Sequence, residues 1–200
     1  MTLPEQIPDQ TTRPRPSNST HRILQGAADR LIERGPADLT LHDVALQAGV
    51  SKALIHYHFA EKESLIVRLV QWATAGFLER QADALAGATP AGAVDHLWRW
   101  LARELELGHL RMLLGLAQYR APRVEDAVQG SLDSRRAAML ATVRHLFALL
   151  DLRPRVPVDL LAGVVVAFGD GLATRPLGEG LADARVAFDI FWLSILSLAE

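Results

Sequence analysis

Residues 40–59 read TLHDVALQAGVSKALIHYHF, and this stretch decides the fold of the N-terminal part of the chain. Thr40 and Ser51 each stand where a side-chain hydroxyl can cap the start of a short helix. Gly49 lies between them, at a position where a left-handed residue would end the first helix. The pattern predicts two short helices joined by a tight turn, which is typical of a helix-turn-helix.

The second helix of this pair is predicted to have one buried side and one free side. Ile55 and Phe59 lie one turn apart and would pack inward, while the small Ala45 lets the two helices cross closely. The side chains that remain on the outer surface are Lys52, Ala53, His56 and Tyr57. A helix that enters the major groove of DNA needs such a free face, so this segment is interpreted as a recognition helix.

Composition and charge bound the class of protein. Of the 200 residues 50% are hydrophobic and 6% aromatic, which is typical of a folded globular protein. The absence of cysteine excludes disulfides and thiolate metal sites, and it fits a reducing cytoplasm. The N-terminus has no apolar run like that of a secretory signal, and the longest apolar stretch, 160–169, is shorter than the roughly 20 residues that span a bilayer. A net charge of −2 argues against non-specific coating of nucleic acid.

The rest of the chain has helical periodicity and no strand pattern. Besides the pair above, helices are predicted over 19–34, from about 60 to 87, from a Thr89 cap onward, and over 110–119, 124–150, 158–174 and 183–199. Residues 1–18 are rich in Pro, Thr, Gln and Arg and are predicted to be disordered. The final helix is apolar on nearly all sides, which indicates cover from a partner subunit.

The segment GVSKALIHYHFAEKESL, residues 49–65, resembles the TetR family of bacterial transcriptional regulators. The family pattern G-V-S-K/R-x-x-L/I/V-Y-x-H-F-x-x-K-x-x-L aligns with it residue by residue. His56 departs from the pattern, where tyrosine is usual, and so does Ala53, where glycine is common. The resemblance implies an all-α fold. Residues 19–78 would be a three-helix helix-turn-helix DNA-binding domain, and residues 79–200 an all-helical ligand-binding and dimerisation domain.

The resemblance also implies a DNA site on and around the recognition helix. The candidates are Thr40, Ser51, Lys52, Ala53, Leu54, His56, Tyr57, His58 and Lys62. Hydroxyl and amine groups suit phosphates and base edges, and methyl groups suit thymine. Lys62 would lie near a helix N-terminus, where backbone N–H groups already favour phosphate. Thr40 and Ser51 could instead be caps only, and His58 could be a half-buried histidine at a helix end.

For the C-terminal domain the resemblance implies an effector pocket and a dimer interface. The pocket candidates are His96, Trp98, Trp100, His109, Arg111, Tyr119 and Arg120, although each alone could be core or surface. Arg111, Arg120 and Arg123 would favour an anionic effector. The interface candidates are Leu161, Val165, Phe168, Leu172, Phe188, Phe191, Trp192 and Ile195.

Together with these patterns, the resemblance implies a homodimeric repressor that binds a palindromic operator in double-stranded DNA and is released by an unidentified small-molecule effector. The expected location is the cytoplasm, at the nucleoid, with no membrane contact. No catalytic residue, cofactor or metal is predicted, because G-x-S-x-G, P-loop and H-E-x-x-H motifs are absent and His56 and His58 diverge by about 200° around a helix. The alternative is a helical dimer that binds a protein partner, which the near-neutral N-terminal segment favours.

Overall fold

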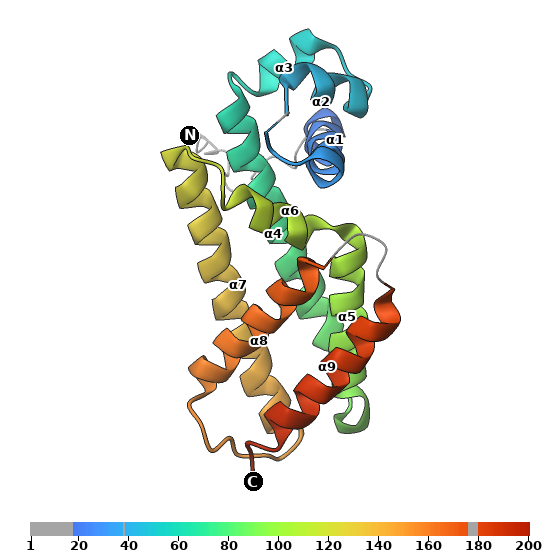
Figure 1. The fold of residues 1–200 in the computed structure, drawn as a ribbon, viewed down its shortest axis with the longest axis vertical. Helices are drawn as coiled ribbons and strands as arrows, with labels where there is room; N and C mark the ends of the chain where they lie inside the picture. The colour runs from blue at the N-terminus through green and yellow to red at the C-terminus, as the bar shows by residue number, and fades with distance from the viewer. Residues whose placement is uncertain (1–17, 38, 176–179) are drawn as a thin grey trace, which may run out of the picture.

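The computed structural model describes residues 18–37, 39–175 and 180–200, and these residues are almost entirely helical (Figure 1). The helices are α1 (Asn18–Arg34), α2 (Leu41–Ala48), α3 (Lys52–His58), α4 (Lys62–Leu85), α5 (Ala93–Leu107), α6 (His109–Leu116), α7 (Pro122–Leu149), α8 (Val158–Ala173) and α9 (Leu181–Leu196). The one β-bridge in the described ranges pairs Pro154 with Ala199. The predicted all-α fold is confirmed, while the predicted disordered tail lies, except for Asn18, outside the described residues.

Local chemistry explains why α2 and α3 begin and end where they do. The Thr40 hydroxyl accepts a hydrogen bond from the Asp43 N–H at 3.1 Å, and the Ser51 hydroxyl accepts one from the Leu54 N–H, also at 3.1 Å. Gly49 has φ 61°, the left-handed conformation that ends α2. The predicted caps and turn are therefore confirmed.

The start of α5 differs from the prediction. Thr89 makes no side-chain cap, and the short 3₁₀ turn Pro90–Gly92 precedes α5, which begins only at Ala93. The fixed φ of Pro90 suits the first position of either helix type, so the sequence signal marked the turn and not the α-helix itself.

Two clusters of buried side chains form the interior. The first joins α1, α2, α3 and the N-terminal half of α4 to α6, and we call these helices the head (Figure 1). The second lies among the C-terminal end of α4, α5, α7, α8 and α9, and we call it the body. Helix α4 contributes Leu69 to the head cluster and Phe77 to the body cluster. Helix α6 contributes Met112 and Leu116 to the head cluster.

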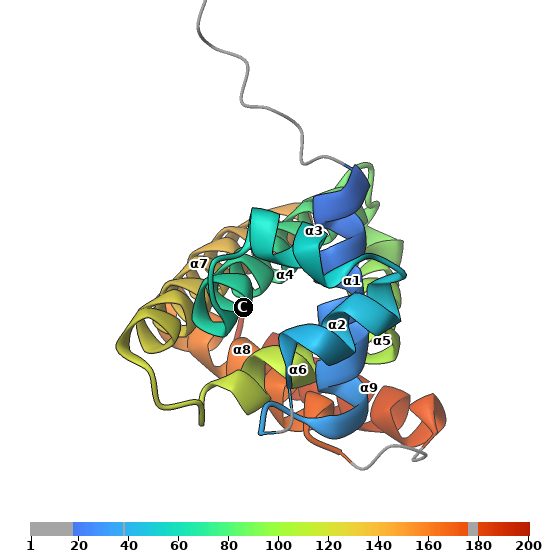
Figure 2. The same cartoon turned by 90° about the horizontal axis from the view of Figure 1, so that it is seen from above.

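Figure 2 looks along the molecule from the head, with α1, α2 and α3 over the helices of the body. Buried polar contacts fasten α4 to α7: the hydroxyls of Thr74 and Ser131 lie 2.6 Å apart, and the Gln81 amide donates to the Thr142 hydroxyl at 2.8 Å. Among the described helices, none is both long and apolar enough to cross a bilayer.

Candidate DNA-binding surface and ligand cavity

Helix α3 lies at the far end of the head and exposes one side to solvent (Figure 1). Ile55 and Phe59 are buried in the head cluster, as the sequence predicts. The opposite side carries the exposed residues Lys52, Ala53, His56 and Tyr57, with Tyr57 82% exposed. Leu54, on the flank, is half-buried. One side of α3 is therefore free along its whole length, and the major groove of DNA is wide enough to admit a helix presented in this way.

Two exposed cap residues border this surface, and both hydroxyls have structural roles. Ser51 caps α3, while Thr40 caps α2 and also donates to the Asp43 carboxylate at 2.6 Å. This hydrogen bond lowers the pKa of Asp43, and the guanidinium of Arg30, 3.8 Å away, acts in the same direction. Asp43 is therefore held ionised beside Thr40.

His58 faces the interior of the head rather than the free side of α3. Its Nε2 lies 3.0 Å from the Ser19 hydroxyl and its Nδ1 lies 3.4 Å from the Thr20 hydroxyl, so both ring nitrogens meet the start of α1. This is the half-buried histidine at a helix end that the sequence left open as an alternative. The imidazole joins α1 to α3.

Lys62 is also engaged within the chain. Its ammonium lies 5.5 Å from the centre of the Tyr119 ring and 3.5 Å from the carbonyl oxygen of Pro36. Next to it, Arg123 forms an ion pair with Glu61 at 2.7 Å. Tyr119, just before α7, and Arg123, in the first turn of α7, thus contact the N-terminus of α4, and Lys62 is part of that contact.

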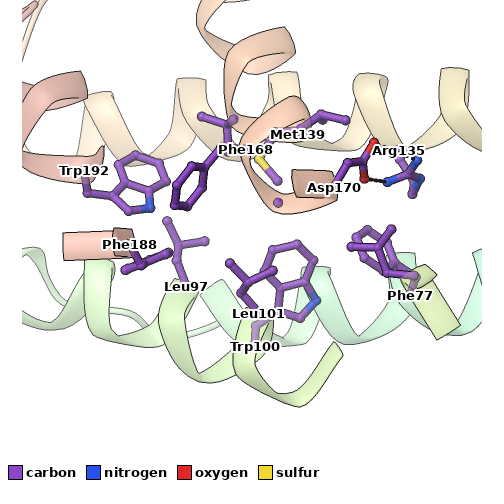
Figure 3. A pocket seen from close by; sticks show the side chains of 14 residues that line it. Phe77, Leu97, Trp100, Leu101, Arg135, Met139, Phe168, Asp170, Phe188 and Trp192 are labelled. Atoms are coloured by element: carbon purple, nitrogen blue, oxygen red, sulfur yellow. Dashed lines mark hydrogen bonds and ion pairs between the residues drawn. The ribbon is translucent and has the colours of Figure 1, made fainter. Parts of the chain in front are cut away.

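The body encloses an apolar cavity between α4, α5, α7, α8 and α9 (Figure 3). Five aromatic side chains line it: Phe77, Trp100, Phe168, Phe188 and Trp192. Aliphatic side chains and Met139 fill most of the remaining wall. Such a site suits a small apolar molecule.

One ion pair interrupts the apolar wall. Arg135 of α7 donates to the two carboxylate oxygens of Asp170 of α8 at 2.6 and 3.4 Å, and Arg135 is only 5% exposed. The guanidinium also lies 5.8 Å from the centre of the Phe77 ring of α4. Arg135 of α7 therefore contacts side chains of two neighbouring helices, α4 and α8.

The structure does not bring the seven predicted effector residues together, and only Trp100 lines the enclosed cavity. Trp98 is half-buried against Phe188, with its ring 5.6 Å from the Arg185 guanidinium. The Nδ1 of His96 lies 3.0 Å from the carbonyl oxygen of Ala84, beside an open surface groove.

The other four candidates lie nearer the head. His109 is buried with its ring centre 5.2 Å from that of Trp72. Arg111 donates to the carbonyl oxygens of Ala173 and Arg175 at 2.9 and 2.6 Å, so it holds the end of α8. The remaining two candidates are Tyr119, which lies under Lys62, and the exposed Arg120.

The sequence reading missed the charged pair of the cavity, although a signal existed. Arg135 stands one turn before the buried Met139 on α7, and Asp170 on α8 directly follows the longest apolar stretch of the chain, 160–169. A charge at a core position of an amphipathic helix indicates a buried partner, and these two charges are opposite.

Most of the predicted dimer-interface residues are buried within the protomer. Six of the eight are buried in the body cluster, and they are Leu161, Val165, Leu172, Phe188, Trp192 and Ile195. Phe168 and Phe191 are half-buried and stack on each other with ring centres 4.0 Å apart. The exposed apolar side chains of α8 and α9 are others: Leu160, Val164, Val186, Ile190 and Leu193.

Comparison with known proteins agrees with the geometry of the head. Residues 23–69 match the family described as bacterial regulatory proteins, tetR family. An HTH-type transcriptional repressor of Mycobacterium tuberculosis is 33% identical over 130 residues, which are 64% of this chain and 67% of that protein.

Solved structures show the same fold over most of the chain. A TetR transcription regulator from Haloarcula marismortui has a TM-score of 0.73 and 20% identity, covering 92% of this chain and 99% of its own. GusR of Salmonella enterica has a TM-score of 0.72 and 17% identity, covering 94% of this chain and 100% of its own. With the helix-turn-helix and its free recognition helix, these matches show that the chain belongs to the TetR family, as a DNA-binding transcriptional regulator and not an enzyme.

Proposed function

We propose that this protein is a homodimeric repressor that binds a palindromic operator and releases it when a small molecule enters the body. The observation that carries the proposal is the free side of α3, where Lys52, His56 and Tyr57 project from a helix held by Ile55 and Phe59. A protein that acts on chromosomal DNA works at the nucleoid, in the cytoplasm.

The exposed residues of α3 would make the sequence-specific contacts. Tyr57 and His56 can exchange hydrogen bonds with base edges, Lys52 can reach guanine or phosphate, and Ala53 offers a methyl group to thymine. Leu54, Thr40 and Ser51 would border the groove. His58 and Lys62 would act through position instead, because each is already engaged with other parts of the chain.

A second copy of the chain would cover the exposed apolar side chains of α8 and α9. Exposed apolar patches of this kind on a regulator with one recognition helix favour a two-fold dimer, which presents two such helices. A dimer with two-fold symmetry reads a palindrome, with half-sites about one helical turn, roughly 34–36 Å, apart.

Helix α4 would carry the response from the cavity to the DNA. Its Phe77 lines the cavity, and its Leu65, Ile66 and Leu69 belong to the head cluster. A ligand that shifts Phe77 therefore shifts the helix on which the head is built. Because coupling between two binding equilibria is reciprocal, operator DNA must weaken ligand binding by the same factor.

Selection of genomic fragments by the purified protein, at two salt concentrations, tests the proposal. The expected result is enrichment of one palindromic sequence, with binding that falls steeply as salt rises because phosphate contacts release counterions. Tyr57→Ala should lose the enrichment without unfolding. A wild-type protein that folds, dimerises and enriches no sequence would instead indicate a protein-interaction module.

A further inference from the structure

The charges on the cavity wall are balanced. Arg135 and Asp170 neutralise each other within hydrogen-bond distance, and no other charged side chain lines the cavity among the described residues. A ligand that brought a net charge into this apolar space would leave one charge without a partner, which is costly in a medium of low dielectric constant. An anion would in addition meet the Asp170 carboxylate. The arginines that could attract an anion, Arg111, Arg120 and Arg123, do not line the cavity.

The cavity wall also offers hydrogen-bond donors that the described part of the chain does not use. The Nε of Arg135 and the Nε1 of Trp100 are buried and have no hydrogen-bond partner there. Both residues line the cavity, and both atoms carry a proton. A buried donor without a partner is unfavourable, so an acceptor atom supplied by a ligand would bind favourably there.

From these two observations we propose that the effector is an uncharged, largely aromatic or aliphatic molecule with a carbonyl-type oxygen, which accepts a hydrogen bond from Arg135. The inference rests on the proposed ligand response and names the chemical class of the ligand. The apolar body of the molecule would lie among Phe168, Phe188 and Trp192, and its oxygen would face the Arg135 end of the cavity (Figure 3).

The space present in the cavity sets how such a ligand acts. The free volume is about 30 Å³, which is room for about two water molecules. A larger molecule therefore has to displace side chains, and Met139 is the most adaptable of those on the wall. Because Arg135 contacts Asp170 on α8 and Phe77 on α4, a ligand that binds its guanidinium moves groups on both helices.

Three molecules of nine non-hydrogen atoms test the class directly: acetophenone, benzoate and cumene. They share a phenyl ring and carry a ketone, a carboxylate and an isopropyl group. The full-length protein would be labelled with ¹³C at its methionine methyl groups and titrated with each one. Of the three methionines, Met139 lines the cavity and Met112 lies in the head cluster, so the Met139 signal reports binding and the Met112 signal provides a comparison from outside the cavity.

Acetophenone should shift the Met139 signal and bind at least tenfold more tightly than benzoate. Asp170→Asn, which leaves Arg135 uncompensated, should reverse this order in favour of benzoate. In the apolar double variant Arg135→Met/Asp170→Leu, the affinity for acetophenone relative to cumene should fall about tenfold, because the hydrogen bond is lost. Benzoate binding as tightly as acetophenone to the wild type, or an unchanged acetophenone-to-cumene ratio, would overturn the proposal.

A pair of glycine variants checks that the cavity is the binding site. Gly169 lines the cavity, and a Cβ there would lie 3.8 Å from a methyl carbon of Leu101, so the side chain of Gly169→Leu should occupy the space. Gly130 of α7 is exposed with nothing near its Cβ position, so Gly130→Leu is a control with the same gain in helix propensity.

Gly169→Leu should abolish the Met139 shift, and Gly130→Leu should retain it. Equal binding by the two variants, or no Met139 shift in the wild type, would refute the cavity as this site. These measurements need no DNA. A protein that selects an operator but does not bind acetophenone refutes the ligand class alone, whereas one that binds acetophenone and selects no DNA refutes the proposed repressor.

Discussion

At the residue scale, the chain's two lysines form a natural comparison. Lys52 is exposed on α3, whereas Lys62 packs on Tyr119. We predict that Lys52→Ala weakens operator binding, reduces the slope of log affinity against log salt by about one, and leaves the melting temperature unchanged.

Lys62→Ala should lower the melting temperature by about 1–3 °C, because it removes a cation–π contact between the start of α4 and Tyr119, which follows α6. Fluorescence anisotropy with operator DNA and thermal unfolding followed by circular dichroism measure both effects. If Lys52→Ala lowered the melting temperature and Lys62→Ala left it unchanged, the DNA-binding role and the packing role of the two lysines would be exchanged.

His109 gives the molecule a predictable dependence on pH. Burial, and to a smaller extent the positive charge of Arg80, lowers the pKa of His109. Above about pH 6.5 the imidazole is neutral in the folded and the unfolded chain. As the pH falls below that value the unfolded chain takes up a proton that the folded chain does not, so folding stability decreases.

We therefore predict that the wild type loses more stability between pH 7.5 and pH 5.5 than His109→Phe, which keeps a ring against Trp72 but does not titrate. Urea unfolding at the two pH values measures this difference. The exposed His145 provides the control, because His145→Phe should keep the wild-type dependence. If the stability of the wild type and of His109→Phe changed equally with pH, His109 would not be the source of the pH dependence.

The site could be predicted from the sequence where its geometry is local. Thr40, Gly49 and Ser51 act on backbone groups within a few residues, so their roles and the free side of α3 follow from spacing alone. The cavity depends on which helices come together. Arg135 and Asp170 are 35 residues apart, and although each charge indicates a buried partner, neither helix by itself identifies the other charge as that partner.

At the scale of elements, the close crossing of α1 and α2 depends on Gly26. A Cβ at this position would lie 2.9 Å from the backbone nitrogen of Ala48 and 3.1 Å from its Cα, and backbone atoms cannot move aside cheaply. We predict that Gly26→Ala destabilises the protein by about 1–3 kcal/mol. Gly130→Ala, at an exposed helical position with open space, should be neutral or stabilising by up to about 1 kcal/mol. Urea unfolding of the two variants compares them, and equal stability would contradict the close packing.

Helix positions were predictable to within a few residues, because apolar periodicity and caps are properties of one segment. The faces of α8 and α9 were not. A helix that is apolar nearly all round carries little information about which side is buried. Packing against the rest of the body selects Phe188 and Trp192 of α9 as core and leaves Ile190 and Leu193 exposed.

At the scale of the whole molecule, that exposed apolar surface should hold the dimer together. We predict that Leu193→Arg, at a side chain 70% exposed, converts the dimer to a monomer with unchanged helical content. Ala141→Arg, on an exposed position of α7, should remain dimeric. Sedimentation velocity separates the two species. A Leu193→Arg protein that stays dimeric would place the interface elsewhere.

Helices α4 and α6 connect the head to the body, since each contributes side chains to the head cluster and to the body cluster. The proposed repressor therefore requires two heads held at a fixed separation by one dimer, so that a single operator engages both α3 helices at once.

Hydroxyl-radical footprinting of the wild-type protein on its selected DNA fragment tests whether one operator engages both α3 helices. We predict two protected segments related by two-fold symmetry, with centres about one helical turn apart. Leu193→Arg should lose both segments together at the same protein concentration. A single protected segment, equally strong for the wild type and for Leu193→Arg, would contradict the account.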